Sequence, residues 1–214
     1  MFFYGDGDGK AAYRMFLNSI RSDKRFKIDE SPKYWTVITS SNSENKLTIY
    51  CNKPLTEPED ELAQRKLKEY MDENDIIPTV IVHRGHSYFV PTTLEYITPD
   101  VKLVMLGSCG GYHNLSRILN TASDAHIISS KQTGTGVVNE TILKELHSEL
   151  MTKNELNWIT MWSDLEKDFA KLRPVDREYF SDYVPPNKNL GAIFIKGLQA
   201  HYGYDVVRDR AFIL

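Results

Sequence analysis

The sequence of 214 residues has only two cysteines, Cys51 and Cys109, and no large excess of either charge, since 26 basic and 29 acidic residues leave a net charge of -3. Two cysteines in a chain of this length cannot form a disulfide scaffold, so we expect reduced thiols. A pI near 6.1 does not suit a nucleic-acid platform, whose pI usually exceeds about 9. No nucleic-acid partner is therefore expected.

Long hydrophobic runs are also missing, and none approaches the roughly 18 residues that a membrane helix needs, so no membrane partner is expected. No repeat, low-complexity tract or Gly/Ser-rich linker divides the chain. Met1 leads directly into Phe2–Tyr4 without the basic region and cleavage site of a signal peptide. This is compatible with the cytoplasm, but such an opening also fits a domain cut from a longer protein, so the compartment and the oligomeric state stay open.

Strand-like and helix-like patterns alternate along the chain. Uninterrupted apolar runs, which are typical of strands covered on both faces of a parallel sheet, are Phe2–Tyr4, Thr79–Val82, Val101–Leu106 and Ala125–Ser129. A hairpin is expected from Tyr34–Thr39 and Leu47–Cys51. Helical periodicity marks Ala11–Ile20, the stripe of Ala63, Leu67, Tyr70 and Met71, Asn114–Leu119, a helix capped by Asn139, the segments around Trp158, Trp162 and Phe169, and Leu190–His201.

These patterns predict one α/β domain over residues 1–214 with three layers, in which helices cover both faces of a mostly parallel sheet. The α/β core spans about 1–152, and a helical extension of about 153–214 packs on it.

Two of the buried strands end in chemically reactive residues. Val80–Val82 leads into His83, Arg84, Gly85, His86 and Ser87, and Lys102–Leu106 leads into Gly107, Ser108, Cys109, Gly110 and Gly111. Functional groups gather at the carboxyl ends of parallel strands, and neighbouring strands lie about 4.8 Å apart. A cysteine nucleophile needs an imidazole that activates the thiolate and protonates the leaving group. The sequence therefore predicts a dyad of Cys109 and His86.

These two blocks resemble the strand-then-Gly-His and strand-then-Ser-Cys-Gly blocks of the caspase-like (clan CD) cysteine peptidases, with separase- and gingipain-type blocks nearest. The resemblance covers roughly residues 75–135 and implies a caspase-like fold and a cysteine endopeptidase acting on a peptide or protein substrate. It implies Cys109 as nucleophile, His86 as general acid and base, and an oxyanion hole from backbone N–H groups of Cys109, Ser87 and Gly110. It implies no metal and no organic cofactor.

Several residues around the dyad have supporting or competing roles. Gly85 and Ser108 are expected to shape the two strand ends. His83 is a supporting residue and the competing base, but strand alternation and a turn at Gly85 predict that His86 lies nearer to the sulfur. Cys51, with neither glycine nor histidine beside it, is expected to be structural.

The resemblance implies that loops at the same sheet edge form the substrate pocket, which would then include Asp6, Asp8, Lys131 and Thr133. The acidic loop would favour a basic side chain before the cut bond. Residues 5–10 do not match a P-loop, because Ala11 follows Lys10, or a calcium loop, because Leu17 stands at its twelfth position. The remaining histidines are expected at structural or surface positions: His113, His126, His147 and His201. The basic residues of the segment 21–27 are expected to form a solvated face: Arg21, Lys24, Arg25 and Lys27.

Two other functions remain open. Ser87 stands where most of the resembling family has glycine after the catalytic histidine, which fits a peptide-binding module that has lost turnover. A small-molecule hydrolase or transferase could use the same dyad.

Overall fold

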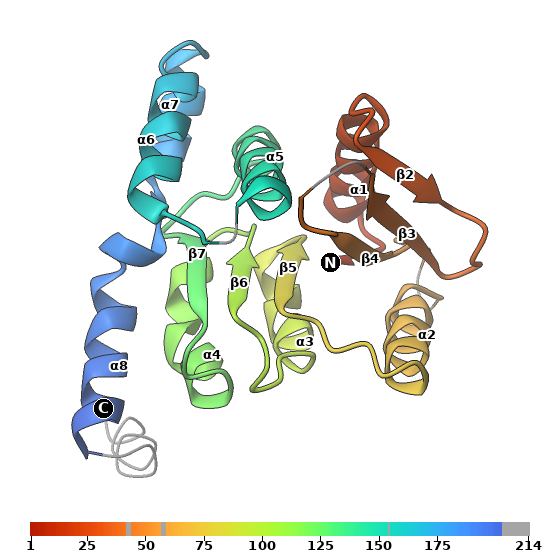
Figure 1. Ribbon diagram of the computed structural model, residues 1–214, viewed down its shortest axis with the longest axis horizontal. Coiled ribbons are helices and arrows are strands. Elements are labelled where there is room, and N and C mark those ends of the chain that lie inside the picture. Colours follow the sequence, from red (N-terminus) through yellow and green to blue (C-terminus); the bar gives the residue numbers. More distant parts are fainter. Residues whose placement is uncertain (42–43, 57–58, 154, 203–214) are drawn as a thin grey trace.

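The computed structural model describes residues 1–41, 44–56, 59–153 and 155–202, and its centre is a five-stranded sheet (Figure 1). The strand order is β1-β5-β6-β7-β8, and the first four strands are mutually parallel. Their bounds are Phe2–Phe3 (β1), Val80–Arg84 (β5), Leu103–Leu106 (β6), His126–Ser130 (β7) and Tyr183–Val184 (β8). The mostly parallel α/β sheet expected from the apolar runs is confirmed.

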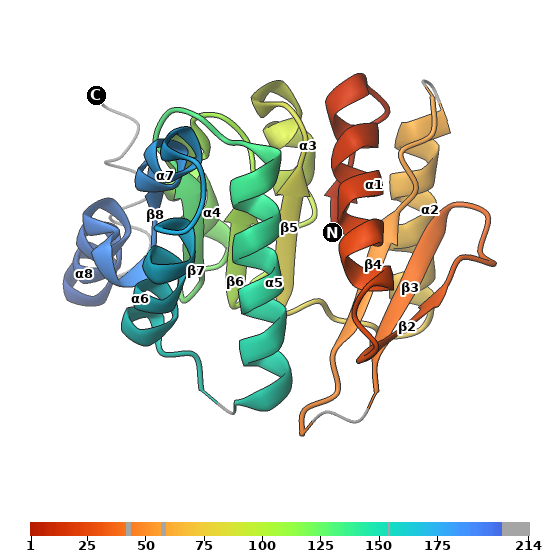
Figure 2. The same cartoon turned by 90° about the horizontal axis from the view of Figure 1, so that it is seen from above.

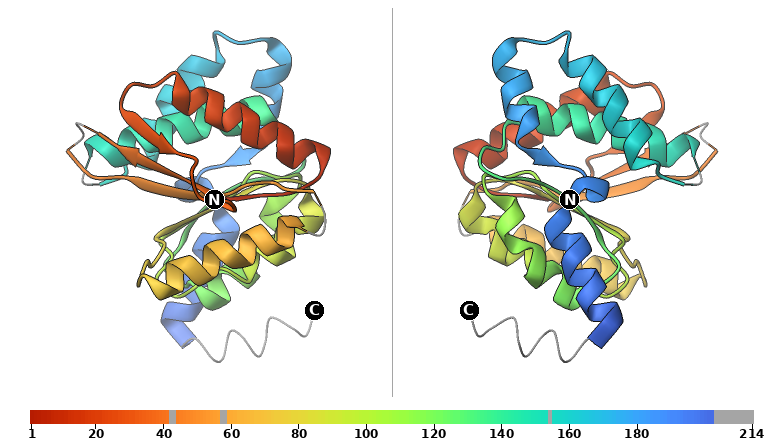
Figure 3. Two further views of the ribbon diagram at one scale, coloured as in Figure 1. Left: turned by 90° about the vertical axis from the view of Figure 1, so that its right-hand side faces the viewer. Right: turned by 90° about the vertical axis from the view of Figure 1, so that its left-hand side faces the viewer.

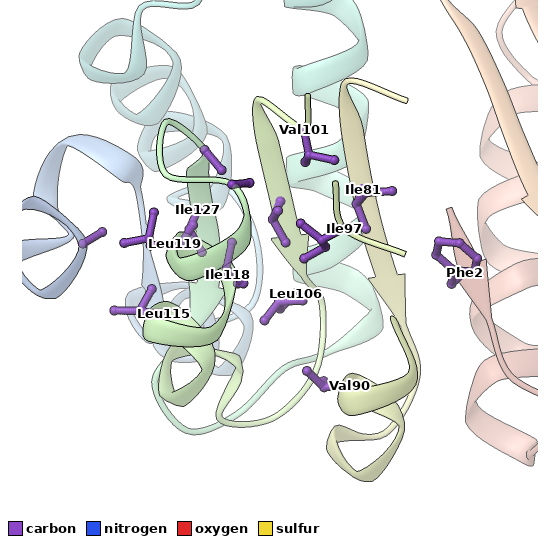
Figure 4. Packing of buried hydrophobic residues seen from close by; sticks show 14 of the residues in the cluster. Phe2, Ile81, Val90, Ile97, Val101, Leu106, Leu115, Ile118, Leu119 and Ile127 are labelled. Atoms are coloured by element: carbon purple, nitrogen blue, oxygen red, sulfur yellow. The ribbon is translucent and has the colours of Figure 1, made fainter. Parts of the chain in front are cut away.

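Helices cover both faces of this sheet, as the edge-on views in Figure 3 show. One face carries α3 (Val90–Leu94), α4 (Leu115–Thr121) and α8 (Leu190–Tyr202). Residues from these helices and from the strands, including Val90, Leu115, Ile118, Ile81 and Ile127, form one buried apolar cluster (Figure 4). Because the connections that follow β5 and β6 both lie on this face, they anchor the two strand ends that carry the predicted dyad.

The opposite face carries α5 (Gly136–Thr152), α6 (Trp158–Phe169) and α7 (Pro174–Ser181). Ile142, Leu143, Trp162 and Phe180 from these helices join Met105 and Ile128 in a second buried cluster. The helical character expected beyond residue 155 is thus observed: α6 and α7 cover this face, and α8 covers the other.

A second, three-stranded sheet of order β2-β3-β4 stands beside β1 (Figure 2). It is antiparallel and consists of β2 (Phe26–Asp29), β3 (Trp35–Ser40) and β4 (Thr48–Asn52), with α1 (Gly7–Arg21) and α2 (Glu59–Glu73) on its two sides. The amide of Asn52 joins the two sheets by accepting from Phe3 N (2.9 Å) and donating to Phe3 O (2.7 Å). The expected hairpin corresponds to β3 and β4.

Local details differ from the sequence expectation at four places. Helix α1 begins at Gly7 instead of Ala11, because the Asp6 side chain accepts from Gly9 N. Residues 26–29 form β2, whereas only a solvated face was expected for the segment from Arg21 to Lys27. Thr135, not Asn139, caps α5, and Asn139 lies buried inside the helix. The short strand β8 was not expected, because two residues carry too little pattern.

In the described part of the chain, no helix combines the length and apolar composition needed to span a membrane.

Candidate active site

The two strands that carry the predicted dyad are direct neighbours in the sheet. The first four residues of β5 each pair with the residue 23 positions later in β6, ending with His83 opposite Leu106. Gly107 N then donates to His83 O (3.0 Å), which extends the pairing one residue beyond the end of β6. His86 and Cys109 are separated by the same 23 positions, so each lies three residues after the last paired residue of its strand, at the same carboxyl edge.

The Cys109 side chain lies at the surface in a turn that follows β6. Gly110 has φ of 63°, a left-handed conformation that glycine adopts without strain, and it turns the chain into the 3-10 helix η2 (Gly111–Asn114). Gly134 lies against this turn so closely that a Cβ on it would stand 2.6 Å from the Ser108 carbonyl carbon. The loop after β7 is therefore in direct contact with the backbone before Cys109.

The backbone donors around Cys109 differ from the expected oxyanion set in one respect. Gly110 N–H donates to Gln132 O at 2.9 Å, so it is already occupied, and the expectation that it holds an oxyanion is wrong for this conformation. Ser87 is exposed and begins the 3-10 helix η1 (Ser87–Phe89). At that position an N–H has no acceptor within the helix, so the amides of Ser87 and Cys109 are the remaining candidates.

The His86 imidazole is about half exposed and faces the β1–α1 turn. Its Nε2 lies 2.9 Å from Asp8 Oδ2 and 3.5 Å from Asp6 Oδ2. The ring also stacks on Tyr88, with centroids 5.2 Å apart and an interplanar angle of 18°. Asp6 and Asp8 were expected to line a substrate pocket, and the structure places both carboxylates beside His86 instead.

His83 is fully buried, in contrast to His86. Its Nδ1 lies 2.7 Å from Thr93 Oγ1, and its Nε2 lies 3.2 Å from the carbonyl oxygens of both Gly85 and His86. Burial lowers the pKa of His83 to about 4, so the ring is neutral near pH 7. Since carbonyl oxygens only accept, Nε2 carries the proton and Nδ1 accepts from Thr93. Both ring nitrogens are thus occupied in holding the loop that carries His86.

Gly85 lies at the bend between these two histidines, as expected. A Cβ there would stand 2.7 Å from Cδ2 of Tyr4. The Tyr4 hydroxyl in turn lies 2.5 Å from Thr93 Oγ1. The absence of a side chain at Gly85 therefore lets Tyr4, Thr93 and His83 pack together beneath the bend.

A second network lies beneath the Cys109 turn. Asn139 Nδ2 donates to Gly107 O (3.1 Å), and the Tyr183 hydroxyl donates to Asn139 Oδ1 (2.8 Å) and accepts from Thr135 N (3.2 Å). Asn139 and Tyr183 were not expected at the site, and the only sequence signal was a polar residue among the apolar positions of α5.

Lys131 and Thr133 lie on the loop that contacts the Cys109 turn, where the sequence placed them. Both are held by Asp182. Lys131 N donates to the carbonyl oxygen of Asp182 (2.9 Å), and Thr133 N donates to its side-chain Oδ2 (3.0 Å). Ser108 is buried, and its carbonyl oxygen accepts from Ser130 Oγ (2.7 Å). These contacts fasten the loop and the turn, but no described cavity includes Lys131 or Thr133.

The remaining cysteine and histidines divide into buried and exposed groups. Cys51 is buried, and burial raises the pKa of its thiol to about 12, in agreement with a structural role. His147 is buried, whereas His113 is exposed and has its ring edge 3.2 Å from where a Cβ on Gly110 would stand. His113 is thus a second imidazole near the Cys109 turn, which its sequence context did not signal.

A cavity of about 520 Å³ lies elsewhere, lined by residues of β4, α2 and the start of β5, such as Ile49, Leu67 and Val80. None of the predicted site residues lines it. Within the described residues, no group of three His, Cys, Asp or Glu side chains could hold a metal ion.

No family model, curated protein or solved structure matches this chain.

Proposed function

We propose that this protein is a cysteine peptidase of caspase-like type that hydrolyses peptide bonds with Cys109 as nucleophile and His86 as general acid and base. The observation that carries the proposal is the shared offset of 23 residues between the paired strands and between His86 and Cys109. Two adjacent parallel strands thereby present an exposed thiol and an accessible imidazole at one edge. No metal or organic cofactor enters the reaction.

The reaction divides into two balanced steps. In acylation the thiol proton passes to the His86 imidazole, sulfur attacks the scissile carbonyl carbon, and the imidazolium returns the proton to the leaving nitrogen as the C–N bond breaks. The products are a thioester on Cys109 and a free amine. In deacylation the imidazole takes a proton from water, the hydroxide attacks the thioester, and the thiol re-forms as the acid product leaves.

The oxyanion formed in each step needs donors that are not already engaged. The N–H groups of Cys109 and Ser87 fit this requirement. Because Gly110 N–H is held by Gln132 O, it serves to set the turn. Removal of one such donor typically costs about 100- to 1000-fold in rate. Stabilisation of the oxyanion is therefore assigned to the amides of Cys109 and Ser87 and not to that of Gly110.

The first test is covalent labelling by a set of peptidyl acyloxymethyl ketones that differ in the residue before the reactive group, read by intact-protein mass spectrometry. We expect one label on the wild type and none on Cys109→Ala. The matched control is Cys51→Ala, which removes the other thiol of the chain. Labelling that persists in Cys109→Ala, or disappears only in Cys51→Ala, would overturn the assignment.

The histidine assignment has its own matched pair, because His86 and His113 are both exposed and follow the neighbouring strands β5 and β6. We expect His86→Ala to lower cleavage of a fluorogenic peptide library at least 100-fold and His113→Ala to change it less than threefold. The reverse order would assign the base to His113. Tight binding of an extended peptide without cleavage would instead favour the peptide-binding module that Ser87 suggests.

A further inference from the structure

We propose that Asp8 is a positioning residue for His86: it holds Nε2 of the imidazole and thereby leaves Nδ1 for the thiol of Cys109. The inference rests on the proposed peptidase function and adds an acidic member to the dyad. It also changes the expected role of the acidic turn, from recognition of a basic substrate side chain to orientation of the catalytic base.

The contact between Asp8 and His86 favours one position of the ring proton. Asp8 Oδ2 lies 2.9 Å from His86 Nε2, the distance of an ion pair. A carboxylate beside Nε2 favours the tautomer that carries the proton on that nitrogen. In the neutral ring Nδ1 then has the free lone pair that can take the thiol proton.

Asp6 supports this arrangement from a fixed position. Its Oδ1 accepts from Gly9 N (2.8 Å) as the cap of α1, while its Oδ2 lies 3.5 Å from His86 Nε2 and accepts from the Tyr88 hydroxyl (3.4 Å). The cap orients the carboxylate, so its second oxygen points toward the imidazole. Asp6 is only 20% exposed, whereas Asp8 is 69% exposed, so Asp6 is the more rigid of the two.

The ring is also held on its face by Tyr88, which stacks on it at an interplanar angle of 18°. Among the described residues, the titratable groups in contact with the His86 ring are therefore Asp6, which caps α1, Asp8, in the first turn of α1, and Tyr88 from η1. Cys109 is the thiol that the ring would serve. Two carboxylates favour the imidazolium that forms when the thiol proton is transferred. A flat exposed ring with contacts on its edge and its face has fewer orientations to lose when substrate binds.

The local sequence explains why both carboxylates reach the same ring. Asp6 is the residue before α1, and Asp8 lies in its first turn, where acidic side chains are favoured by the helix dipole. Because β1 pairs in parallel with β5, with Phe3 opposite Arg84, the start of α1 lies beside the loop that carries His86. The pairing of the strands thus brings the helix start to the base.

The test compares Asp8→Ala, Asp8→Asn and Asp8→Glu with Glu61→Gln as the matched control. Glu61 is likewise an exposed acid in the first turn of a helix, α2, but has no contact with His86. We expect kcat for the best library peptide to fall at least tenfold in Asp8→Ala with KM within twofold, and Asp8→Glu to recover part of the loss. Glu61→Gln should match the wild type. A raised KM with unchanged kcat, confined to peptides with a basic residue, would return Asp8 to the substrate pocket and overturn the proposal.

A second readout does not depend on peptide cleavage. The rate of Cys109 alkylation by iodoacetamide is measured against pH in the wild type, Asp8→Asn and Glu61→Gln. Loss of a negative charge beside an imidazolium weakens its hold on the proton, so the alkaline limb of the reactivity profile should move to lower pH in Asp8→Asn alone.

The two readouts separate the two proposals. Wild-type protein that cleaves no peptide, but whose alkylation profile moves as expected in Asp8→Asn, would refute the peptidase function and retain the positioning role. Identical alkylation profiles in all three proteins would overturn the positioning role whatever the cleavage assay shows.

Discussion

At the scale of single residues, two histidines three positions apart take opposite environments. His83 is buried, with its pKa lowered to about 4 and both ring nitrogens engaged, whereas the His86 side chain is 46% exposed. A neutral ring with no free nitrogen cannot exchange protons with a thiol. His83 instead donates to the carbonyl oxygen of His86, so it positions the backbone of the residue proposed as the base.

Gly134 leads to a prediction at the same scale. An alanine Cβ there would stand 2.6 Å from Ser108 C and 2.7 Å from Ser108 O, and such backbone atoms cannot yield without moving the Cys109 turn. We expect Gly134→Ala to slow probe labelling of Cys109 at least tenfold and to lower the free energy of unfolding by about 1–3 kcal/mol. Labelling kinetics and urea unfolding measure the two effects.

The matched control is Gly197→Ala in α8, where a Cβ meets no atom within 4 Å. Removing a glycine from a helix interior should stabilise the protein by up to about 1 kcal/mol and leave labelling unchanged. Equal labelling rates in the two variants would show that contact with Gly134 does not set the Cys109 turn.

At the scale of elements, the Cys109 turn depends on contacts between β6, α5 and β8. Asn139, from the second turn of α5, accepts from the Tyr183 hydroxyl of β8 and donates to Gly107 O at the end of β6. Asn139 is buried, and burial raises the pKa of Tyr183 well above its usual range, so its hydroxyl stays protonated and remains a donor. The network therefore ties three elements together at the residue that begins the reactive turn.

A double-mutant cycle tests this network. We expect Asn139→Ala to lower the free energy of unfolding by about 2–4 kcal/mol, because it leaves a buried carbonyl and a buried hydroxyl without their partner. Tyr183→Phe should cost about 1–2 kcal/mol. Since both changes remove the same hydrogen bond, the double variant should be less destabilised than the sum by about 1 kcal/mol, as measured by urea unfolding. Strict additivity would mean that the two side chains stabilise the fold independently.

At the scale of the whole molecule, two buried histidines make stability depend on pH. Burial lowers the pKa of both His83 and His147 to about 4, below the value near 6.5 of an unfolded chain. Between these values the unfolded chain binds protons that the folded protein does not. The contribution of these histidines to the free energy of unfolding should therefore be complete above about pH 6.5. It should be lost as the pH decreases toward 4, which lowers the free energy of unfolding by on the order of 3 kcal/mol for each histidine.

The corresponding prediction compares urea unfolding at pH 7, 6 and 5 for the wild type, His147→Leu and His113→Gln. His147 contacts the rings of Phe16 and Phe26 edge-on, far along the chain from the proposed dyad. We expect a shallower loss of stability toward pH 5 in His147→Leu than in the wild type. His113→Gln, which changes an exposed ring, should retain the wild-type slope. An unchanged slope in His147→Leu would contradict the buried neutral state.

Much of the architecture was predictable, because it depends on patterns a few residues long. Uninterrupted apolar runs identified β5, β6 and β7 as parallel strands covered on both faces, and their ends identified His86 and Cys109. Short or polar elements were not predictable: β2 alternates half-buried and exposed residues and β8 has two residues. Asn139 resembled a cap from its residue type alone, although Thr135 takes that role.

The sequence by itself determined which strands are buried and that a thiol and an imidazole follow two of them, since burial pattern and residue type are properties of each segment. Only the tertiary structure decided which groups surround them. Asp8 meets His86 because β1 pairs with β5, and Gly110 N–H is occupied because the loop after β7 crosses the Cys109 turn. Such contacts join segments distant along the chain, and their geometry depends on strand pairing and close packing, which no local pattern encodes.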